Sequence, residues 1–495
     1  MGCWALSRTK KPISRTRTHL RRKPGWVFCC LEEHVLKAPF DIAGDLDTPV
    51  SAFAKLGAFN PRFLLESVEG GERLARYSFI GFGEGLEVRL TPDGLTVGDE
   101  RHPVPKDQQE LLAQLRRALA LAPRPLPEVP GVPLAGGLVG FTSYEVVRFF
   151  EKIPVKNVPS SAPILHYIAP KSLLVFDHLT RAIALLHAGT EAERQALRTQ
   201  VIEALRGPLP PVRQNGRFSD PDVSLSREAY VAGVKAAQEY IASGDVYQLV
   251  LSSKFTGTHD LDPFQVYRAL RLINPSPYMY YVKLGGIDVV GSSPEALVRL
   301  HGGKAELRPI AGTLPRMADP EADVANERRL LADPKENAEH VMLVDLARND
   351  LGRVAKAGSV HVKPYRAIER YSHVMHIVSG VHGEIAPGKD AFDLFAATFP
   401  AGTLVGAPKV RAMQIIEELE PIARGLYGGT IGYFGAQGDM DQAITIRTIV
   451  FEGDRYSYQA GAGVVSESRP ESEHDEVFAK SAALRSALAL AQEGL

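Results

Sequence analysis

Cysteine is scarce in this sequence and is confined to its start, at Cys3, Cys29 and Cys30. No cysteine follows, so the body of the chain has no disulfide framework and no thiol nucleophile. This usage is typical of a reducing compartment, and we expect a cytoplasmic protein. Long apolar runs are missing too. Because no stretch reaches the roughly 18 apolar residues of a membrane-spanning helix, we expect no membrane span.

Net charge is also small, at −1, but it is unevenly distributed. Residues 1–23 contain eight lysines and arginines and no acidic residue, which leaves the rest of the chain acidic. Residues 1–26 lack the apolar core of a secretory signal. They are compatible with a disordered tail, an extension upstream of the true start, a transit peptide or a nucleic-acid-binding arm. We expect a disordered tail and no nucleic-acid partner.

The chain has 495 residues, of which 45% are hydrophobic and 23% charged, which is enough for two domains. A proline-rich segment at 207–224 predicts a linker between an N-terminal domain, 27–206, and a second domain, 225–495. Short β-like runs joined by glycine-containing turns, without regular strand–helix alternation, indicate an α+β fold with antiparallel sheet. The clearest expected elements are strands at 86–90, 172–176 and 246–252 and a helix at 226–243.

Two pairs of glutamates share one local design: Glu336 with Glu339, and Glu473 with Glu476. A separation of three residues places each pair on one helix face, and the apolar residues that follow would bury that helix. Four converging carboxylates repel one another unless a cation joins them, and oxygen ligands without cysteine favour Mg²⁺. Spacing alone is also compatible with two solvated helix faces.

Glycine-rich and cationic segments follow in the second half. Residues 402–413 predict a loop of small residues followed by a helix whose first turn accommodates Pro408. The start of such a helix is a place for an anion, although the spacing of a phosphate-binding loop is missing. Glycines near 461–463 let backbone amides approach a ligand. Arg447 lies in an alternating run that predicts a strand, where it could pair with a carboxylate or be a surface charge. His376, in an apolar stretch, could be a core residue or a proton carrier.

Residues 342–350, 406–413 and 461–465 resemble the chorismate-utilising enzymes, in that family's order along 225–495. The resemblance implies antiparallel sheets packed as a sandwich with helices on the outside. Gln248 stands where water-using members place a lysine base, which resembles the ammonia-using branch. Ala311 stands where enzymes that form 4-amino-4-deoxychorismate place a nucleophilic lysine. The family branch that these positions resemble converts chorismate and ammonia into anthranilate and pyruvate.

The resemblance also implies roles for single residues. Glu339 and Glu476 would bind Mg²⁺ directly, and Glu336 and Glu473 would hold its waters. His376 and Thr403 would be catalytic. The substrate would be held by Gly312, Thr313, Tyr427, Arg447, Gly461 and Gly463.

Two further segments, 64–67 and 274–279, resemble the tryptophan feedback motif of the anthranilate-forming members. The resemblance implies an effector site for L-tryptophan at Glu66, Ser67, Pro277, Tyr278 and Met279. Because the body of the chain has no cysteine nucleophile, ammonia from glutamine would require a separate glutamine amidotransferase subunit. The alternatives are formation of aminodeoxychorismate for folate biosynthesis, or a noncatalytic regulator that binds chorismate or tryptophan.

Overall fold

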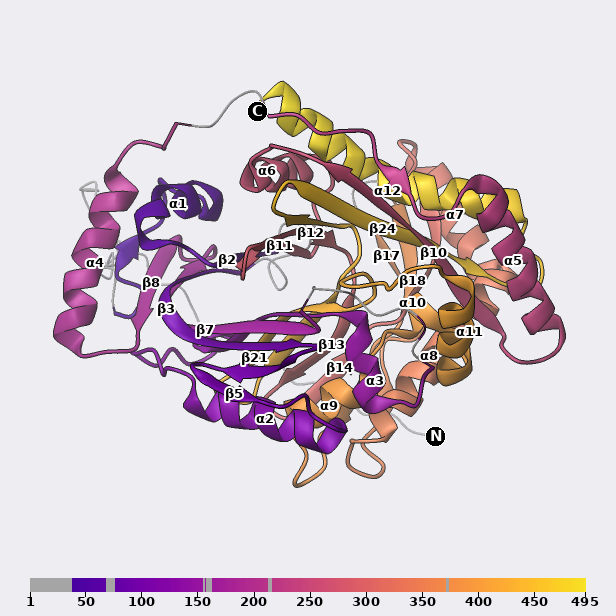
Figure 1. Cartoon of the computed structure of the whole chain (residues 1–495), viewed down its shortest axis with the longest axis horizontal. Helices are drawn as coiled ribbons and strands as arrows, with labels where there is room; N and C mark the ends of the chain where they lie inside the picture. The colour runs from indigo at the N-terminus through magenta and orange to yellow at the C-terminus, as the bar shows by residue number, and fades with distance from the viewer. Residues whose placement is uncertain (1–37, 68–75, 155, 157–162, 212–215, 371–373) are drawn as a thin grey trace, which may run out of the picture.

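Antiparallel pairing organises the computed structural model of the chain, which describes residues 38–67, 76–154, 156, 163–211, 216–370 and 374–495. Among these residues, 21 strands join into one continuous sheet and three form a second, small sheet. The long pairs of strands run antiparallel, and the helices lie around the outside of the strands (Figure 1). The α+β class is therefore confirmed. The expected tail, 1–26, lies outside the described residues.

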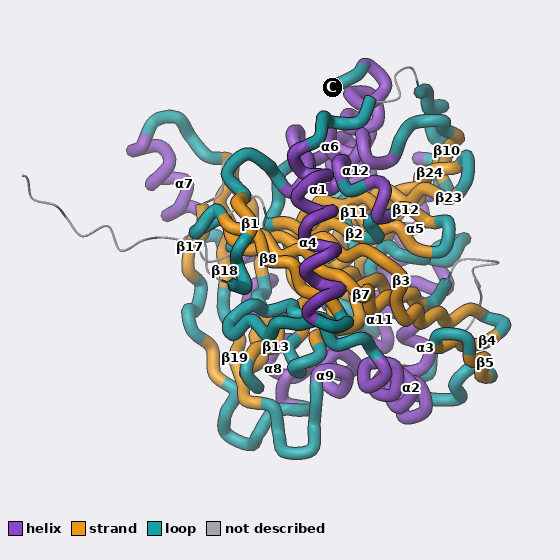
Figure 2. The backbone as a smooth tube through the Cα atoms, turned by 90° about the vertical axis from the view of Figure 1, so that its left-hand side faces the viewer, coloured by secondary structure: helices purple, strands orange, loops and turns teal. Residues whose placement is uncertain are grey.

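The N-terminal part is built on two long strands, 77–91 and 165–177, which contain the expected strands 86–90 and 172–176. Figure 2 shows its helices α1 and α4 in front of these strands. The elements are helices α1 (Pro49–Lys55), α2 (Gln108–Leu121), α3 (Val147–Phe150) and α4 (Glu191–Arg206), and strands β1 (Ile42–Ala43), β2 (Phe63–Glu66), β3 (Tyr77–Thr91), β4 (Gly94–Val97), β5 (Glu100–His102), β6 (Gly137–Thr142), β7 (Leu165–Asp177) and β8 (Ala182–His187).

The C-terminal part carries most of the strands and every segment singled out as a catalytic candidate. Its helices are α5 (Arg227–Ala242), α6 (Pro263–Ile273), α7 (Pro320–Ala332), α8 (Pro334–Gly352), α9 (Ala391–Thr398), α10 (Gly402–Val405), α11 (Lys409–Leu419) and α12 (Pro470–Glu493). Its strands are β9 (Asp222–Val223), β10 (Gln248–Thr258), β11 (Tyr278–Leu284), β12 (Ile287–Ser293), β13 (Ala296–His301), β14 (Lys304–Leu307), β15 (Ile310–Pro315), β16 (His361–Val362), β17 (Ala367–Arg370), β18 (Val374–Val378), β19 (Val381–Glu384), β20 (Gly406–Ala407), β21 (Thr430–Gly435), β22 (Met440–Ile444), β23 (Thr448–Glu452) and β24 (Arg455–Val464).

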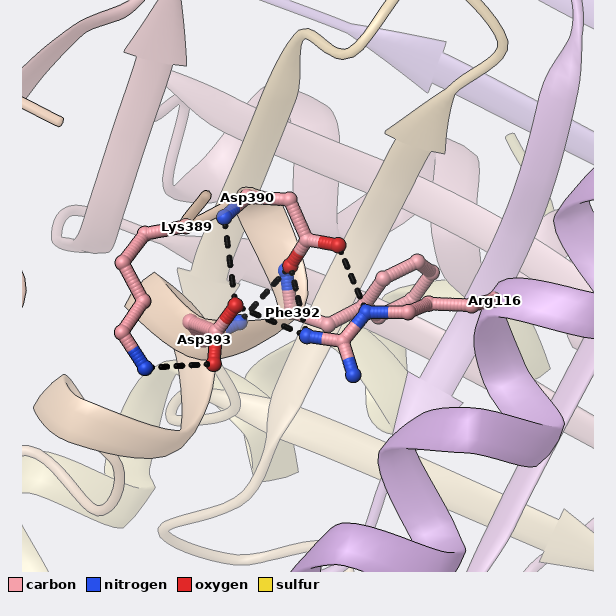
Figure 3. Close-up of polar contacts among 5 residues, drawn as sticks. All are labelled: Arg116, Lys389, Asp390, Phe392 and Asp393. Carbon is pink, nitrogen blue, oxygen red and sulfur yellow. Dashed lines mark hydrogen bonds and ion pairs between the residues drawn. The ribbon is translucent and has the colours of Figure 1, made fainter. Parts of the chain in front are cut away.

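Strands from both sides of the proline-rich segment 207–224 share one sheet. Strand β2 pairs with β11, and β6 pairs with β21. A side-chain link adds to this contact, because Arg116 of α2 reaches the first turn of α9 (Figure 3). Its guanidinium donates to both carboxylate oxygens of Asp390, at 2.7 and 3.1 Å, and to Asp393 at 2.7 Å. The boundaries 27–206 and 225–495 stay predictions, with hydrogen-bonded strands joining the two parts.

The first helix and strand of the C-terminal part show how local sequence determines the fold. Helix α5 begins after Ser226, whose hydroxyl accepts the backbone N–H of Ala229, which confirms the expected cap. The expected strand 246–252 begins later, at Gln248, because the backbone of Tyr247 still turns toward Ala407. Tyr247 is consequently exposed, whereas Leu249 and Leu251 are fully buried.

Helices of the described residues pack against the sheet rather than standing alone. Each of them is too short or too polar to cross a lipid bilayer. Helix α12, the longest at 24 residues, packs against α6, α5 and β24 and buries Val477, Leu484 and Leu488. Its polar side is therefore left free to face a cavity or solvent.

Candidate active site

A cavity of about 230 Å³ lies where β10, α8, α10, β24 and α12 meet. Sixteen residues line it, and seven of them are residues that the sequence predicted for the site: Gln248, Glu339, Thr403, Tyr427, Arg447, Gly461 and Gly463. They come from segments that are up to 215 residues apart in the chain, from Gln248 to Gly463. The fold therefore brings most of the predicted site into one space.

Helix α8 positions Glu339 at this cavity. The helix begins after Asp333, whose carboxylate accepts the backbone N–H groups of Lys335 at 2.9 Å and Glu336 at 3.1 Å. Across the cavity, the side-chain amide of Gln248 donates to Glu339 at 3.2 Å. The amide oxygen of Gln248 is buried and finds no hydrogen-bond partner among the described residues. A buried polar atom of this kind is costly unless a ligand satisfies it.

Helix α12 brings the second acidic pair, Glu473 and Glu476, beside the cavity, although of this helix only Lys480 lines it. Lys480 forms an ion pair with Glu476, four residues earlier, at 2.7 Å and donates to the carbonyl oxygen of Gly461 at 3.0 Å. Burial and then the charge of Glu339 raise the pKa of Glu336, and Glu476 on the other helix adds to this shift. Burial also raises the pKa of Glu473, with a further contribution from Glu476. The carboxylates of both helices therefore act on one another.

The donor set of these helices fits Mg²⁺. No group of three or more histidine, cysteine, aspartate or glutamate side chains in the described part of the chain is arranged to hold a metal ion. Mg²⁺, however, usually keeps several waters and takes only one or two carboxylates. Glu339 and Gln248 in the cavity lining, and Glu476 on the adjoining face of α12, carry the oxygen atoms that such an ion prefers. A cation would also relieve the repulsion that raises the pKa values of Glu336 and Glu473.

The opposite wall is formed by glycines and by Tyr427. Gly461 and Gly463 lie on β24 and pair with Ser252 and Val250 of β10. A Cβ atom on Gly461 would lie 2.6 Å from the hydroxyl of Tyr427, and one on Gly463 would lie 2.7 Å from the side-chain nitrogen of Gln248. Only glycine therefore leaves room for the cavity and exposes the backbone there.

Arg447 occupies this wall in a conformation that the sequence did not predict. The expected strand across 443–448 is interrupted, because β22 ends at Ile444 and β23 begins at Thr448. Arg447 lies between them with φ of 49°, in the left-handed region that non-glycine residues rarely adopt. The prediction of a strand at Arg447 was wrong. Such strain clusters at functional sites, where the surrounding structure enforces it.

Glu295 also lines the cavity, and the sequence gave no signal for it. Its carboxylate accepts a hydrogen bond from Thr403 at 3.0 Å. Burial raises the pKa of Glu295 to about 7, against the lowering effects of Thr403, Arg447 and Lys480. A carboxyl group of this kind is half-protonated near neutral pH, as a general acid requires. Lys480, a second omission, could have been found from its four-residue spacing to Glu476.

Three predicted residues form a neighbouring cluster on the small sheet. His376 of β18 has its Nδ1 atom 2.9 Å from the carbonyl oxygen of Gly312 and 3.1 Å from the hydroxyl of Thr313, both on β15. Gly312 has φ of 70°, and a Cβ atom there would lie 3.0 Å from the carboxylate of Glu336. This cluster therefore adjoins the acidic pair of α8 but is not part of the cavity lining.

The five predicted effector residues lie together at the junction of β2 and β11, where Glu66 pairs with Met279. The carboxylate of Glu66 accepts hydrogen bonds from the hydroxyl of Tyr267 and from Arg271, at 3.1 and 3.3 Å. Pro277 is buried, and the hydroxyl of Tyr278 lies 2.7 Å from Arg299 and 2.9 Å from Asp441. The buried hydroxyl of Ser67 has no hydrogen-bond partner within the part of the chain that the structure describes.

This fold and cavity define a class of α+β enzymes in which two acidic helices face a wall of glycines and a cationic side chain. Residues 60–486 match the family of chorismate binding enzymes, to which this chain belongs, and its relatives place it in the anthranilate synthase component 1 branch.

The comparisons cover nearly the whole chain. Anthranilate synthase component 1 of Thermus thermophilus is 45% identical over 456 residues, which are 91% of this chain and 97% of that protein. The protein of the same name from Acinetobacter calcoaceticus is 42% identical over 91% of this chain and 94% of its own length. The solved structure of anthranilate synthase component I from Streptococcus pneumoniae, 33% identical, superposes with a TM-score of 0.74 and covers 90% of this chain and 99% of that chain.

Proposed function

We propose that this chain converts chorismate and ammonia into anthranilate and pyruvate, with Mg²⁺ and with a separate glutaminase subunit as the ammonia source. One observation carries the proposal: a single cavity holds Glu339 of the acidic helix α8, the arginine and glycines suited to a carboxylate, and a half-buried acid, Glu295. The names of the relatives support the same reaction. Position 311 is an alanine and not a lysine, which favours attack on the chorismate ring by ammonia rather than by a side chain of this protein.

Chorismate carries two carboxylates, and the two sides of the cavity suit one each. Arg447 and Tyr427, with the backbone N–H groups of Gly461 and Gly463, would hold the carboxylate of the pyruvyl group. A Mg²⁺ ion bound to Glu339 and Glu476 would neutralise and orient the ring carboxylate, with Glu336 and Glu473 holding its waters. Gly312 and Thr313 would border the ring carboxylate beside this ion.

The proton steps can be assigned to groups in and beside the cavity. Ammonia adds to C2 of the ring while the hydroxyl group leaves C4 and takes a proton from Glu295 to depart as water. The partnerless amide oxygen of Gln248 can accept an N–H of the incoming ammonia, which a lysine ammonium could not do. Thr403 fixes Glu295 through its hydroxyl, and His376 is the second candidate proton carrier. The ammonium formed on C2 loses one proton to become the amine. Removal of the remaining hydrogen of C2 as a proton then makes the ring aromatic as the bond between C3 and the ether oxygen breaks, and the methylene carbon of the enolpyruvyl group takes up a proton to give pyruvate.

A glutaminase partner follows from the cysteine content. Glutamine hydrolysis by a thiol needs a cysteine beside a histidine, and no cysteine follows Cys30. The purified chain should therefore form anthranilate from chorismate, Mg²⁺ and ammonium salts but not from glutamine. Anthranilate is measured by its fluorescence, which aminodeoxychorismate lacks. A non-fluorescent product, or glutamine use by the pure chain, would contradict the proposal.

Regulation by L-tryptophan is the last part of the proposal. The paired residues Glu66 and Met279, with Ser67, Pro277 and Tyr278, would bind tryptophan away from the cavity lining. Inhibition then requires two states of the chain that differ in affinity for chorismate.

A further inference from the structure

The small sheet that carries His376 stands apart from the other strands. Among the described residues its strands β15, β18 and β17 pair only with one another, so no strand ladder joins them to the large sheet. Figure 2 shows β17 and β18 at the edge of the molecule beside α7, and an apolar cluster of Leu330, Met375 and Ile377 packs α7 against β18. The position of the small sheet relative to α8, the helix of the first acidic pair, therefore depends on contacts outside the strand ladders.

One such contact joins His340 of α8 to Ser379. Ser379 lies directly after β18, where the chain leaves the small sheet for β19 of the large sheet. Its hydroxyl oxygen lies 2.7 Å from Nε2 of His340 and accepts the backbone N–H of Arg366 at 2.9 Å. His340 and Ser379 are both 0% exposed. This hydrogen bond is therefore shielded from water, and it connects α8 with the end of β18.

Both ends of the hydrogen bond lie close to residues of the proposed site. His340 directly follows Glu339 in the chain, and Ser379 comes three residues after His376. Gly312, whose carbonyl oxygen lies 2.9 Å from Nδ1 of His376, also adjoins the acidic pair of α8. A displacement of the small sheet relative to α8 would therefore move the imidazole of His376 with respect to the proposed metal site.

Stability alone does not account for a histidine at position 340. Its Nε2 atom is satisfied by Ser379, but its Nδ1 atom is buried and has no hydrogen-bond partner within the described residues. A buried polar atom without a partner costs at least as much stability as one hydrogen bond contributes. An apolar ring of similar size would avoid that cost. The choice of an imidazole therefore points to the placement of the two elements that it joins.

We propose that His340 is a positioning residue for His376. Its hydrogen bond to Ser379 holds the small sheet against α8 and so fixes the imidazole of His376 relative to the carboxylates of Glu336 and Glu339. That His376 carries a proton in the reaction rests on the proposed function, whereas its placement by His340 rests on the contacts of α8 and β18. The hydrogen bond should consequently affect turnover more than the binding of chorismate.

The kinetic test uses the full chain with chorismate, Mg²⁺ and ammonium. His340→Phe and Ser379→Ala each remove the hydrogen bond and should lower kcat about tenfold, because a misplacement of roughly 1 Å is costly in an active site. KM for chorismate should change by less than about twofold, since the groups proposed to hold the pyruvyl carboxylate lie on other elements. The matched control is Ser172→Ala, which removes another buried hydroxyl, 2.9 Å from Nδ1 of His187, and should keep kcat.

Thermal melts separate placement from stability. His340→Phe loses one hydrogen bond but also removes the nitrogen without a partner, so it should melt within about 3 °C of the unchanged chain while kcat falls. Ser379→Ala leaves two buried groups of His340 and Arg366 without their partner and should melt lower. If Ser379→Ala does not fold, His340→Phe takes its place in each measurement.

A double-mutant cycle with His376→Ala tests whether the hydrogen bond acts through His376. Ser379→Ala should cause no further loss of kcat in a chain that already carries His376→Ala, because two changes that remove the same contribution are not additive. Equal losses of kcat in both backgrounds would overturn the proposal. So would an unchanged kcat in both His340→Phe and Ser379→Ala.

A measurement without turnover keeps this proposal distinct from the proposed function. In NMR spectra of the chain with isotope-labelled histidine, the imidazole signal of His376 is assigned from its absence in His376→Ala. That signal should shift in Ser379→Ala and stay in place in Ser172→Ala. Failure of the unchanged chain to form anthranilate would defeat the proposed function and leave the NMR result to decide the placement of His376. A His376 signal that does not move in Ser379→Ala would contradict the role of His340.

Discussion

The catalytic cavity and the junction of β2 with β11 differ in how far their polar groups are already hydrogen-bonded. In the cavity, the amide oxygen of Gln248 has no partner among the described residues, and beside it burial and then the charge of Glu339 raise the pKa of Glu336. At the junction, Glu66 is already satisfied by Tyr267 and Arg271. A polar group without a partner gains a hydrogen bond when a ligand binds, whereas a group that already has a partner must give up one hydrogen bond to form another.

This difference suits the two proposed roles. A ligand that binds at the β2–β11 junction must compete with contacts that hold one strand to others, so occupancy and strand arrangement become linked. Tyr278 is such a contact, because its hydroxyl joins Arg299 of β13 and Asp441 of β22. Those two strands lead to Glu295 and Arg447 of the cavity. The exception at the junction is Ser67, whose buried hydroxyl has no partner.

The largest effect should come from removing a carboxylate of the proposed metal site. If Glu339 and Glu476 hold Mg²⁺ as proposed, Glu476→Ala would leave the ion with one direct protein carboxylate, and anthranilate formation should fall on the order of a thousandfold as several kcal/mol of charge stabilisation are lost. Fluorescence of anthranilate against Mg²⁺ concentration measures the loss. The matched control is Glu471→Ala, an exposed glutamate in the first turn of the same helix, which should keep the rate. A near-normal rate in Glu476→Ala would show that the metal assignment is wrong.

Glu295 should give the next largest effect. Its raised pKa, about 7, means that the proton needed by the leaving hydroxyl is present below pH 7 and is lost as the pH rises through that value. The rate of the unchanged chain should therefore decline above about pH 7. Glu295→Gln should lower the rate about a hundredfold, the usual contribution of a general acid, and should abolish this decline. A decline that persists in Glu295→Gln would assign the proton to another group, of which His376 is the first to test.

Glu295 also marks what the sequence could not provide. The acidic pairs were predictable because three-residue spacing on a helix is a local property, and α8 and α12 do carry them. Glu295 stands alone between β12 and β13, and only the long-range placement of Thr403 against it reveals an acid. Its raised pKa arises from burial, which no local pattern encodes.

The backbone conformation at Arg447 is a second feature that could not be predicted from the sequence. The alternating pattern around Arg447 predicts a strand, yet β22 ends at Ile444, β23 begins at Thr448, and Arg447 between them adopts φ of 49°. The strands within β3 and β7 and the helix cap at Ser226 were predictable from local sequence, because the conformational preference of those residues agrees with the conformation that the fold gives them. The pairing of β2 with β11, on opposite sides of the segment 207–224, could not be predicted from local sequence, because the two strands are separated by roughly two hundred residues of chain.

A smaller and more selective effect is expected at the junction. Ser67→Arg places a long cationic side chain where a buried hydroxyl without a partner now lies, which should block tryptophan. The inhibition constant for tryptophan should rise at least about tenfold, equivalent to roughly 1.4 kcal/mol, while chorismate turnover without tryptophan changes little. Inhibition curves by anthranilate fluorescence measure both. Ser243→Arg, at an exposed helix end, is the matched control. Unchanged inhibition in Ser67→Arg would remove the effector assignment.

The smallest effect should come from the link between α2 and α9, which serves neither site. Arg116 makes paired hydrogen bonds to Asp390, the cap of α9, but the two side chains are 39% and 43% exposed. Water already screens such a pair, so Arg116→Ala should lower the free energy of unfolding by about 1 kcal/mol or less. Arg116→Lys should recover only part of this, because an ammonium cannot bond both carboxylate oxygens in one plane. Urea midpoints measure these changes. A larger loss, or altered tryptophan inhibition, would mean that the contact between the two parts of the chain also sets the arrangement of the strands at β2 and β11.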